Sequence, residues 1–304
     1  MDAARHRPLL ALLIRLGAIA ALSTMSALIK LANRDGIHLL EIMFWRQFVT
    51  LPILLGWVLL TSGGLRQLRT ERPGKHFLRS FYGTVGMLLN FGAVILLPLA
   101  EATVMNFTTP IWATMLAILL LHEKVGVWRW SAIALGFLGV LVIAQPGGGH
   151  IPLYGALVGL GGAFMVALIS IQIADLNRTD MPLAIVFYFA LFSAPMTALA
   201  LPFVAHAHDA AGWWLLLGIG ISGSIGQLLL TAALRFGTVA SVIVMDYSAL
   251  FWATLYGALL FGMLPPASTW LGAPLVVLAG VVIAWREHRL SRPAERDLAR
   301  AEGT

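Results

Sequence analysis

The sequence has no cysteine among its 304 residues. This absence excludes disulfides, a thiolate nucleophile and metal sites with cysteine ligands. Charge is also scarce, because Asp, Glu, Lys and Arg make up only 11% of the residues, against about 25% in an ordinary soluble domain. A soluble chain of this length could not hide the remaining apolar surface in one core, so the composition excludes that class of protein.

Several catalytic patterns are missing as well. The chain has no GxxxxGK[S/T] loop, so ATP-driven pumping by this chain alone is excluded. His122-Glu123 is not half of a zinc-protease motif, because Gly126 stands where the second histidine is required. We find no paired aspartates in facing segments. We therefore predict no catalytic residue, no metal and no cofactor.

Apolar residues make up 59% of the chain and lie in ten blocks. Most of the blocks are close to the roughly 20 residues that cross a bilayer as an α-helix, and short turn sequences separate them, so neighbouring helices are expected to be antiparallel. The blocks are residues 9–31, 39–61, 77–98, 102–121, 128–145, 153–174, 182–204, 212–234, 239–262 and 269–285. The sequence thus predicts an all-α integral membrane protein with ten transmembrane helices, whose first block is an uncleaved span.

The net charge of +6 reflects orientation in a membrane, not a nucleic-acid partner. With ten spans, sixteen of the 20 Lys and Arg residues fall on one side, and only Lys30 and Arg34 fall on the other. This tally counts Arg79 in the loop before the third span and leaves Arg15 and Arg46 inside spans. The positive-inside rule then predicts an inner-membrane protein with both termini in the cytoplasm.

The chain also repeats itself. Trp112–Thr114 (WAT) recurs as Trp252–Thr254, 140 residues later, and Gly86 and Gly226 match at the same offset. Each half holds five spans, an odd number, so the second half must insert upside down relative to the first. We therefore expect two inverted five-helix repeats around a central cavity. The expected boundaries are 1–145 and 146–287 for the repeats and 288–304 for a polar cytoplasmic tail.

The layout resembles the EamA-type ten-helix branch of the drug/metabolite transporter superfamily. The strings that carry the resemblance are Leu99–Thr103, Pro110–Ala113, Leu121–Lys124 and Pro146-Gly147 in the first half, and Asp246–Leu250, Leu260–Gly262 and Pro265 in the second. Met263 departs from the acidic residue that the family usually carries after Phe-Gly. The resemblance implies a carrier of small organic metabolites and says little about the substrate.

Arg46 lies about eight residues into the second span, roughly 12 Å deep at 1.5 Å per residue. An ionisable group at such depth is costly and calls for an explanation. The guanidinium could face the cavity and bind a carboxylate or phosphate of the substrate. It could instead form a structural ion pair with Glu41 or with a neighbouring helix.

Asp246 lies about seven residues into the ninth span, at a depth similar to that of Arg15 in the first. Asp246 could be a proton-coupling site, or it could be fixed by Arg15 in an ion pair that joins two helices. Arg15 alone is expected to snorkel toward the headgroups. Lys30, Glu41 and Glu101 gather near the opposite face, where they could form a vestibule or a solvated interface.

Uncharged polar and aromatic residues inside the spans complete the predicted substrate site, because polar groups in lipid need partners. Asn106 and Asp246 occupy equivalent positions in the two repeats, as do Trp112 and Trp252, which could stack on an aromatic ligand or merely pack between helices. The full predicted set is Arg46, Asn90, Asn106, Trp112, Gln172, Gln227, Asp246, Tyr247 and Trp252.

The sequence therefore predicts a secondary active or facilitative transporter that works by alternating access. Its expected partners are the lipid bilayer and a small-molecule substrate, with a proton or counter-substrate as a further candidate. The substrate class favoured by Arg46 is an amino acid, vitamin or related anionic or zwitterionic compound. The alternatives are a channel or passive membrane subunit and, less favoured, an intramembrane enzyme. The sequence indicates no oligomeric state.

Overall fold

A computed structural model describes residues 8–61, 63–121, 127–145, 151–236 and 243–302. These residues form helices joined by short connections, and no strand occurs among them. The resembling strings at 122–124 and 146–147, and the start of the ninth block at 239–242, lie outside the described residues. The first repeat contains α1 (Pro8–Arg34), α2 (Leu39–Leu60), η1 (Gly64–Leu68), α3 (Pro73–Leu96), α4 (Leu99–Asn106), α5 (Thr109–Leu121) and α6 (Val127–Ala144). The second contains α7 (Leu153–Leu176), α8 (Pro182–Ala198), α9 (Leu201–Val204), α10 (Ala210–Phe236), η2 (Ile243–Tyr247), α12 (Ser248–Phe261) and α13 (Ala267–Glu302).

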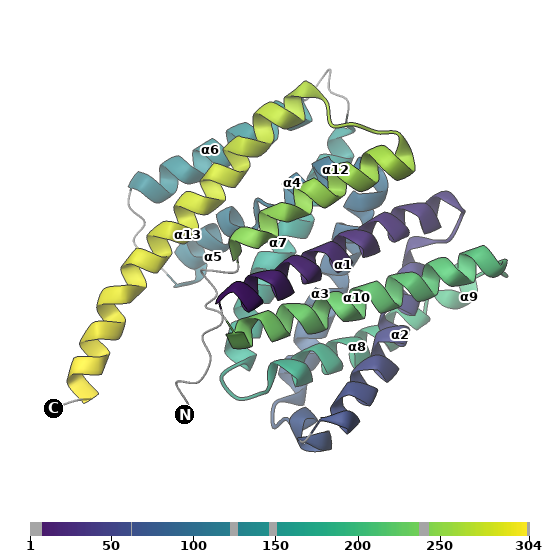
Figure 1. Cartoon of the computed structure of the whole chain (residues 1–304), viewed down its shortest axis with the longest axis horizontal. Coiled ribbons are helices and arrows are strands. Elements are labelled where there is room, and N and C mark those ends of the chain that lie inside the picture. Colours follow the sequence, from purple (N-terminus) through teal and green to yellow (C-terminus); the bar gives the residue numbers. More distant parts are fainter. Residues whose placement is uncertain (1–7, 62, 122–126, 146–150, 237–242, 303–304) are drawn as a thin grey trace.

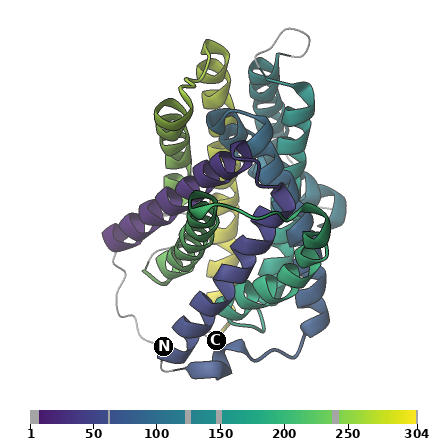
Figure 2. The same cartoon turned by 90° about the vertical axis from the view of Figure 1, so that its right-hand side faces the viewer.

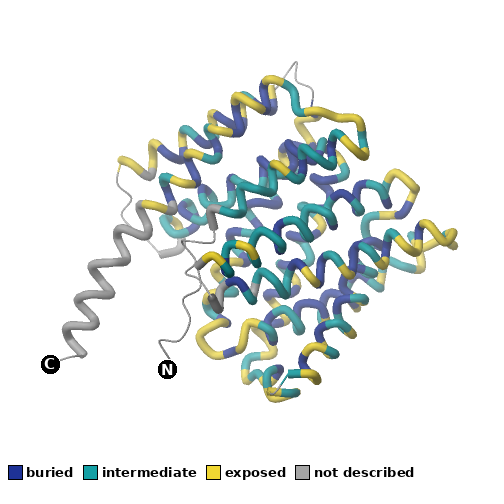
Figure 3. The backbone as a smooth tube through the Cα atoms, in the orientation of Figure 1, coloured by how far each residue is buried: buried dark blue, intermediate teal, exposed yellow. Residues whose placement is uncertain are grey.

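The lengths and surfaces of the helices fit a lipid environment. Six apolar helical segments are long enough to cross a membrane: Leu9–Arg34, Leu39–Leu60, Pro73–Leu96, Leu99–Leu119, Leu153–Leu176 and Ala210–Leu230. Shorter apolar helices cover Trp130–Ala144, Pro182–Ala198 and Ala267–Ile283. Large apolar side chains such as Leu60, Phe203 and Leu264 are exposed, and exposed positions recur along the helices in Figure 3. The all-α membrane fold is thus confirmed.

Two predicted spans are broken helices. The fourth begins earlier than expected, at Leu99, and is interrupted at Phe107 and Thr108 between α4 and α5. The ninth, as far as it is described, changes from the 3-10 helix η2 to α12 after Tyr247. Phe107 and Tyr247 are 140 residues apart, the offset of the repeat. Polar residues lie next to both breaks, Asn106 and Thr108 at the first and Asp246 and Ser248 at the second. Pro110 also lacks the amide hydrogen that a helix interior requires.

The two repeats interlock. Helix α1 of the first packs along α10 of the second, and α3 packs along α7 in the equivalent arrangement (Figure 1). Gly86 of α3 lies against Ile169 of α7, and Gly226 of α10 lies against Leu22 of α1. A side chain at either glycine would meet the facing helix, so matched glycines permit matched close crossings. This symmetry explains why the glycines recur at the repeat offset.

The remaining equivalent helices pair with each other across the repeats. Helices α6 and α13 form a pair at one side of the bundle, and α2 packs against α8 at the other (Figure 1). Helix α13 continues through the polar tail to Glu302 and runs out of the bundle on the side where α1 begins (Figures 1 and 2).

We name the two ends of the bundle by their connections. The basic end contains the start of α1, the segment 63–72 with η1, and the turn 177–181. The far end contains the connections 35–38, 97–98, 205–209 and 262–266. Successive helices run in opposite directions, so the first set of connections lies at one end of the bundle and the second set lies at the other.

Candidate functional site

The two broken spans meet at their breaks. The rings of Phe107 and Tyr247 contact each other edge to face, with centroids 5.1 Å apart. Gly280 of α13 faces the Tyr247 hydroxyl and Pro110, so a side chain there would collide with Tyr247. Discontinuous helices at corresponding positions of two repeats free backbone groups for ligand binding and mark the substrate region of many carriers.

Buried polar atoms without partners occur on the helices α5, α7 and α12. The indole nitrogens of Trp112 and Trp252 are buried and have no hydrogen-bond partner. The same is true of Gln172 Oε1, Ser248 Oγ and Thr254 Oγ1. Buried polar atoms without partners are uncommon and costly, so these donors and acceptors are suited to a ligand. Trp112 also packs edge to face against Phe164 of α7, so it has a packing role between helices, and stacking on a ligand stays a prediction.

For the other uncharged polar residues of the predicted set, the structure gives no unpartnered buried atom that would point to a ligand. Asn90 donates to the Gly86 carbonyl on its own helix at 2.8 Å and packs on Gly162 of α7, so it belongs to the α3–α7 crossing. Asn106 is the last residue of α4 and is partly buried. Gln227 is partly buried on α10. These three residues remain predictions as substrate ligands.

Asp246 forms a bidentate ion pair with Arg15. Arg15 Nε and Nη2 each donate to one carboxylate oxygen at 2.6 Å. The Arg15 side chain is 13% exposed and the Asp246 side chain is 33% exposed, so the ion pair is partly screened by solvent. The ion-pair alternative thus describes the structure, in which Arg15 is held by Asp246. The role of Asp246 in proton coupling stays a prediction.

Arg46 is buried, with 7% of its surface exposed. Its Nη1 donates to Gln47 Oε1 at 2.6 Å, and its Nε has no partner. The proposed ion pair with Glu41 is not formed, because Glu41 Oε1 lies 2.7 Å from Nε2 of His208 across the far end.

Arg79 is the residue that sequence reasoning placed wrongly. It was counted in the loop before the third span, but it lies within α3 and is as buried as Arg46. Its guanidinium lies over the Phe189 ring, 4.0 Å from the centroid. The signal was present, since residue 79 falls inside the apolar block 77–98, yet the charge tally assigned it to a loop.

The far end is tightly closed around α1, α4 and α12. Lys30 Nζ donates to the carbonyls of Val94, Ile95 and Leu97 at the end of α3, at 2.9, 3.2 and 2.6 Å. Glu101 is fully buried and accepts a hydrogen bond from Thr269 at 2.8 Å. These contacts overturn the solvated interface that was one alternative for Lys30, Glu41 and Glu101, all of which are buried.

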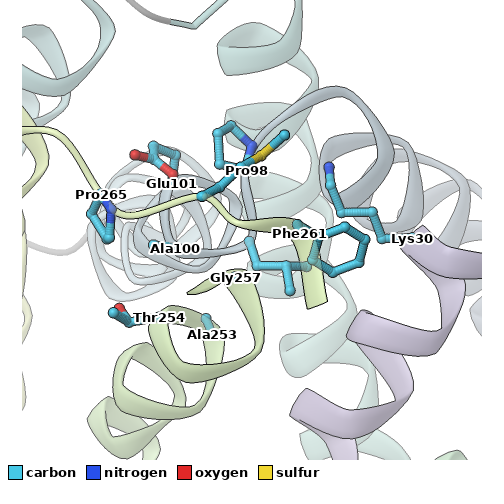
Figure 4. A pocket seen from close by; sticks show the side chains of 11 residues that line it. Lys30, Pro98, Ala100, Glu101, Ala253, Thr254, Gly257, Phe261 and Pro265 are labelled. Atoms are coloured by element: carbon cyan, nitrogen blue, oxygen red, sulfur yellow. The ribbon is translucent and has the colours of Figure 1, made fainter. Parts of the chain in front are cut away.

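A small cavity remains between these helices. Its volume is about 10 Å³, which is room for about one water molecule. Figure 4 shows Lys30 and Phe261 on one side of it and Glu101 and Pro265 on the other. A larger hollow of about 350 Å³ lies between α2, α3 and α8, where Met43, Thr84 and Thr197 are part of its lining.

A family model matches residues 9–145 and again 153–285, with the description EamA-like transporter family. The chain belongs to this family. It is 31% identical over 299 residues to a riboflavin transporter of Vibrio cholerae, covering 97% of this chain and 99% of the relative. It is 29% identical to a pseudopaline exporter of Pseudomonas aeruginosa, covering 86% of this chain and 91% of the relative. It is 27% identical to an S-adenosylmethionine uptake transporter of Rickettsia bellii, covering 83% and 86%.

A solved crystal structure has the same fold, with a TM-score of 0.61, 21% identity and coverage of 92% of this chain and 98% of that one. The family match confirms two EamA repeats and a small-molecule transporter of the drug/metabolite type. The relatives are named as transporters, so the intramembrane enzyme alternative is set aside.

Proposed function

We propose that this chain is an alternating-access carrier of a small aromatic metabolite in the cytoplasmic membrane, with riboflavin as its first expected substrate. The observation that carries the proposal is the meeting of two broken spans at Phe107 and Tyr247. Such a crossing between repeats is where carriers bind substrate near the middle of the membrane. The riboflavin transporter of Vibrio cholerae, similar along almost the whole chain, supports the choice of substrate.

The chemistry of the region suits riboflavin. Its isoalloxazine is a flat three-ring plate with several carbonyl and ring-nitrogen acceptors and one ring N–H donor. Trp112 and Trp252 offer two buried indole donors, and Gln172 offers a buried acceptor. Aromatic side chains also bind a flat heterocycle by stacking, at about 1–3 kcal/mol per contact. A neutral heterocycle replaces the anionic substrate that Arg46 alone suggested.

We place both termini in the cytoplasm, because the basic end carries most of the arginines. The closed far end then faces outward in the structure. Asp246 is our candidate for proton coupling, and Arg15 would have to leave the carboxylate before a proton could bind.

The test is a binding titration of the purified chain with riboflavin, in which the quenching of flavin fluorescence reports binding. Stacking on tryptophan quenches a flavin, so saturable quenching is expected. Trp112→Leu and Trp252→Leu should each weaken binding by about tenfold or more, the equivalent of one lost stacking contact. Uptake of riboflavin by vesicles containing the protein should fall in parallel.

Trp57→Leu is the matched control, because Trp57 is half exposed on α2 and is outside the proposed site. It should bind and transport riboflavin as the unmodified chain does. The proposal fails if riboflavin produces no saturable quenching, or if the two site variants behave like the control.

A further inference from the structure

Two arginines are buried side by side between the helices α2, α3 and α8. Both guanidinium groups lie over the ring of Phe189, Arg79 at 4.0 Å and Arg46 at 5.9 Å from its centroid. Because both lie over one ring, the two guanidinium groups are less than about 10 Å apart, and like charges at this separation repel in a buried site. Two like charges that share one aromatic ring inside a membrane bundle require a compensating group.

No protein carboxylate supplies this compensation. Among the described residues, none forms an ion pair with Arg46 or Arg79, whereas Arg15 and Arg72 each hold an aspartate. Arg46 Nε, Arg79 Nε and Arg79 Nη1 are buried without any hydrogen-bond partner. Cation–π contact with Phe189 attracts the charges, but it leaves these three N–H groups unsatisfied.

Neighbouring polar side chains orient the Arg46 guanidinium, and a glycine faces each of the two arginines. Gln47 accepts from Arg46 and is itself bonded to Ser193, so the side chain is oriented. Gly83 lies beside Arg79, where an added Cβ would sit 3.0 Å from its Nη1. Gly223 of α10 faces Arg46 in the same way, with 3.3 Å to its Nε. Bulkier residues at these two glycines would press on the guanidinium groups.

The neighbouring titratable groups do not neutralise the pair. His76 is buried next to Arg79 on α3, and its Nε2 lies 3.7 Å from Asp180. Asp180 is in turn hydrogen-bonded by Thr179 at 2.8 Å. This carboxylate therefore belongs to the basic end and to His76.

We propose that Arg46 and Arg79 form a binding site for a small oxyanion, a carboxylate or phosphate group held between the two guanidinium forks. Planar guanidinium groups bind such oxyanions through paired hydrogen bonds. Riboflavin carries neither group, so this site is separate from the proposed riboflavin function. The oxyanion is either transported or stationary. If it is transported, it is a free anion or the acidic group of a metabolite.

The test is a thermal titration of the purified full chain with inorganic phosphate and, separately, with acetate. Chloride salts keep the ionic strength constant, so a general salt effect is removed. A ligand that binds only the folded state raises the melting temperature in a saturable way. We expect such a rise with at least one of the two anions.

The variants Arg46→Gln and Arg79→Gln should each weaken the apparent affinity for the anion by about tenfold or more, because each removes charge-assisted hydrogen bonds. Without added anion, Arg79→Gln should melt at the same temperature as the unmodified chain or higher, since it relieves the repulsion. If a glutamine variant does not fold, Arg46→Lys and Arg79→Lys keep the charge and should still bind the anion less tightly. Arg66→Gln is the matched control, because Arg66 is exposed in η1.

The proposal is overturned if neither anion gives a saturable rise, or if the rise is the same in the Arg46 and Arg79 variants as in the control. If an anion does bind, vesicles containing the protein distinguish a transported anion from a stationary one. Uptake of labelled phosphate or acetate identifies the anion as cargo, whereas saturable binding without uptake identifies a stationary ligand. Riboflavin is absent from all of these experiments, so the two proposals fail independently.

Discussion

Equivalent helix pairs at the two ends of the bundle are packed differently. At the far end α1 contacts α3, and Lys30 of α1 donates to three carbonyls at the end of α3. The repeat makes α7 the counterpart of α1 and α10 the counterpart of α3. Within the described helices, α7 and α10 barely touch. The first helices of the two repeats align at an offset of 144 residues, since Asn33–Asp35 corresponds to Asn177–Asp180. At this offset the counterpart of Lys30 is Ala174, which has no amine to make the equivalent contact.

The difference indicates that two repeats with one fold have two conformations. If the repeats exchanged conformations, α7 would close on α10 and α1 would part from α3. Such an exchange moves access from one end to the other, which is the essential step of alternating access in carriers with inverted repeats. The sequence adds a separate contact at each end, Lys30 at the far end and the Arg15–Asp246 pair at the basic end.

The largest effect is expected from cross-linking α1 to α3, the helix pair that is closed at the far end. Arg34→Cys and Leu96→Cys place single thiols at the ends of α1 and α3 in a chain that has no other cysteine. A short thiol-reactive cross-linker between them should abolish transport, because the far end could no longer open. Vesicle uptake before and after cross-linking measures this effect. Arg34→Cys alone, treated in the same way, should keep its activity, and full activity of the cross-linked pair would contradict the account.

Lys30→Met should loosen the closed end. It removes a charged donor from three carbonyls, at a cost of about 1.5–3 kcal/mol, so the open population should rise about tenfold or more. The measurement is the rate at which a single cysteine in place of Ala100, which lines the far-end cavity, reacts with a membrane-impermeant maleimide.

Arg34→Met, one turn later on α1, is the control for Lys30→Met. Arg34 contacts the Phe261 ring without bonding to α3, so its loss should change the labelling rate much less. Equal rates in the two variants would mean that Lys30 does not hold the end closed.

Gly86→Leu and Gly226→Leu test the symmetry itself. An added Cβ would lie 2.9 Å from Ile169 at the first glycine and 2.7 Å from Leu22 at the second. Each variant should lose about 1–3 kcal/mol of stability through overpacking, and the two losses should be similar. Thermal unfolding of the variants provides the comparison. At Gly56 no atom lies within 4 Å, so Gly56→Leu should be nearly neutral. Strongly unequal losses at the matched glycines would argue against equivalent crossings.

The smallest effect is expected at the basic end. The Arg15–Asp246 pair is partly exposed, so its coupling energy should be about 1 kcal/mol or less. A double-mutant cycle with Arg15→Gln and Asp246→Asn in thermal unfolding measures this coupling. Strictly additive variants would show that the pair does not hold α1 to η2.

Much of the fold could be predicted from the sequence, because apolar blocks, turn residues and a matched offset are local or periodic signals. The recurrence of Trp112–Thr114 as Trp252–Thr254 was enough to indicate the two repeats. Pro110 permits a kink in the fourth span, whereas no proline or glycine adjoins Tyr247 in the ninth, so the second break was not predicted. Asn106 and Asp246 lie at the two breaks, but polar residues also occur inside continuous helices, so they do not locate a break.

The candidate site was less predictable, because burial and pairing depend on tertiary contacts. Arg46 was recognised from its depth, but Arg79 was counted with the loop charges. His208 was not recognised as the partner of Glu41, since 166 residues separate them. The Arg15–Asp246 pair was foreseen as one alternative, because both residues lie at similar depths.

The central claim is that the two ends change in opposite directions. Spin labels on Arg34→Cys and Leu96→Cys report the α1–α3 pair, and labels on the equivalent positions, Arg178→Cys and Phe236→Cys, report the α7–α10 pair. Distance distributions for each pair would be measured with and without riboflavin. The account predicts that riboflavin lengthens one distance and shortens the other. It would be contradicted if riboflavin is bound and both distances stay fixed, or if they change in the same direction.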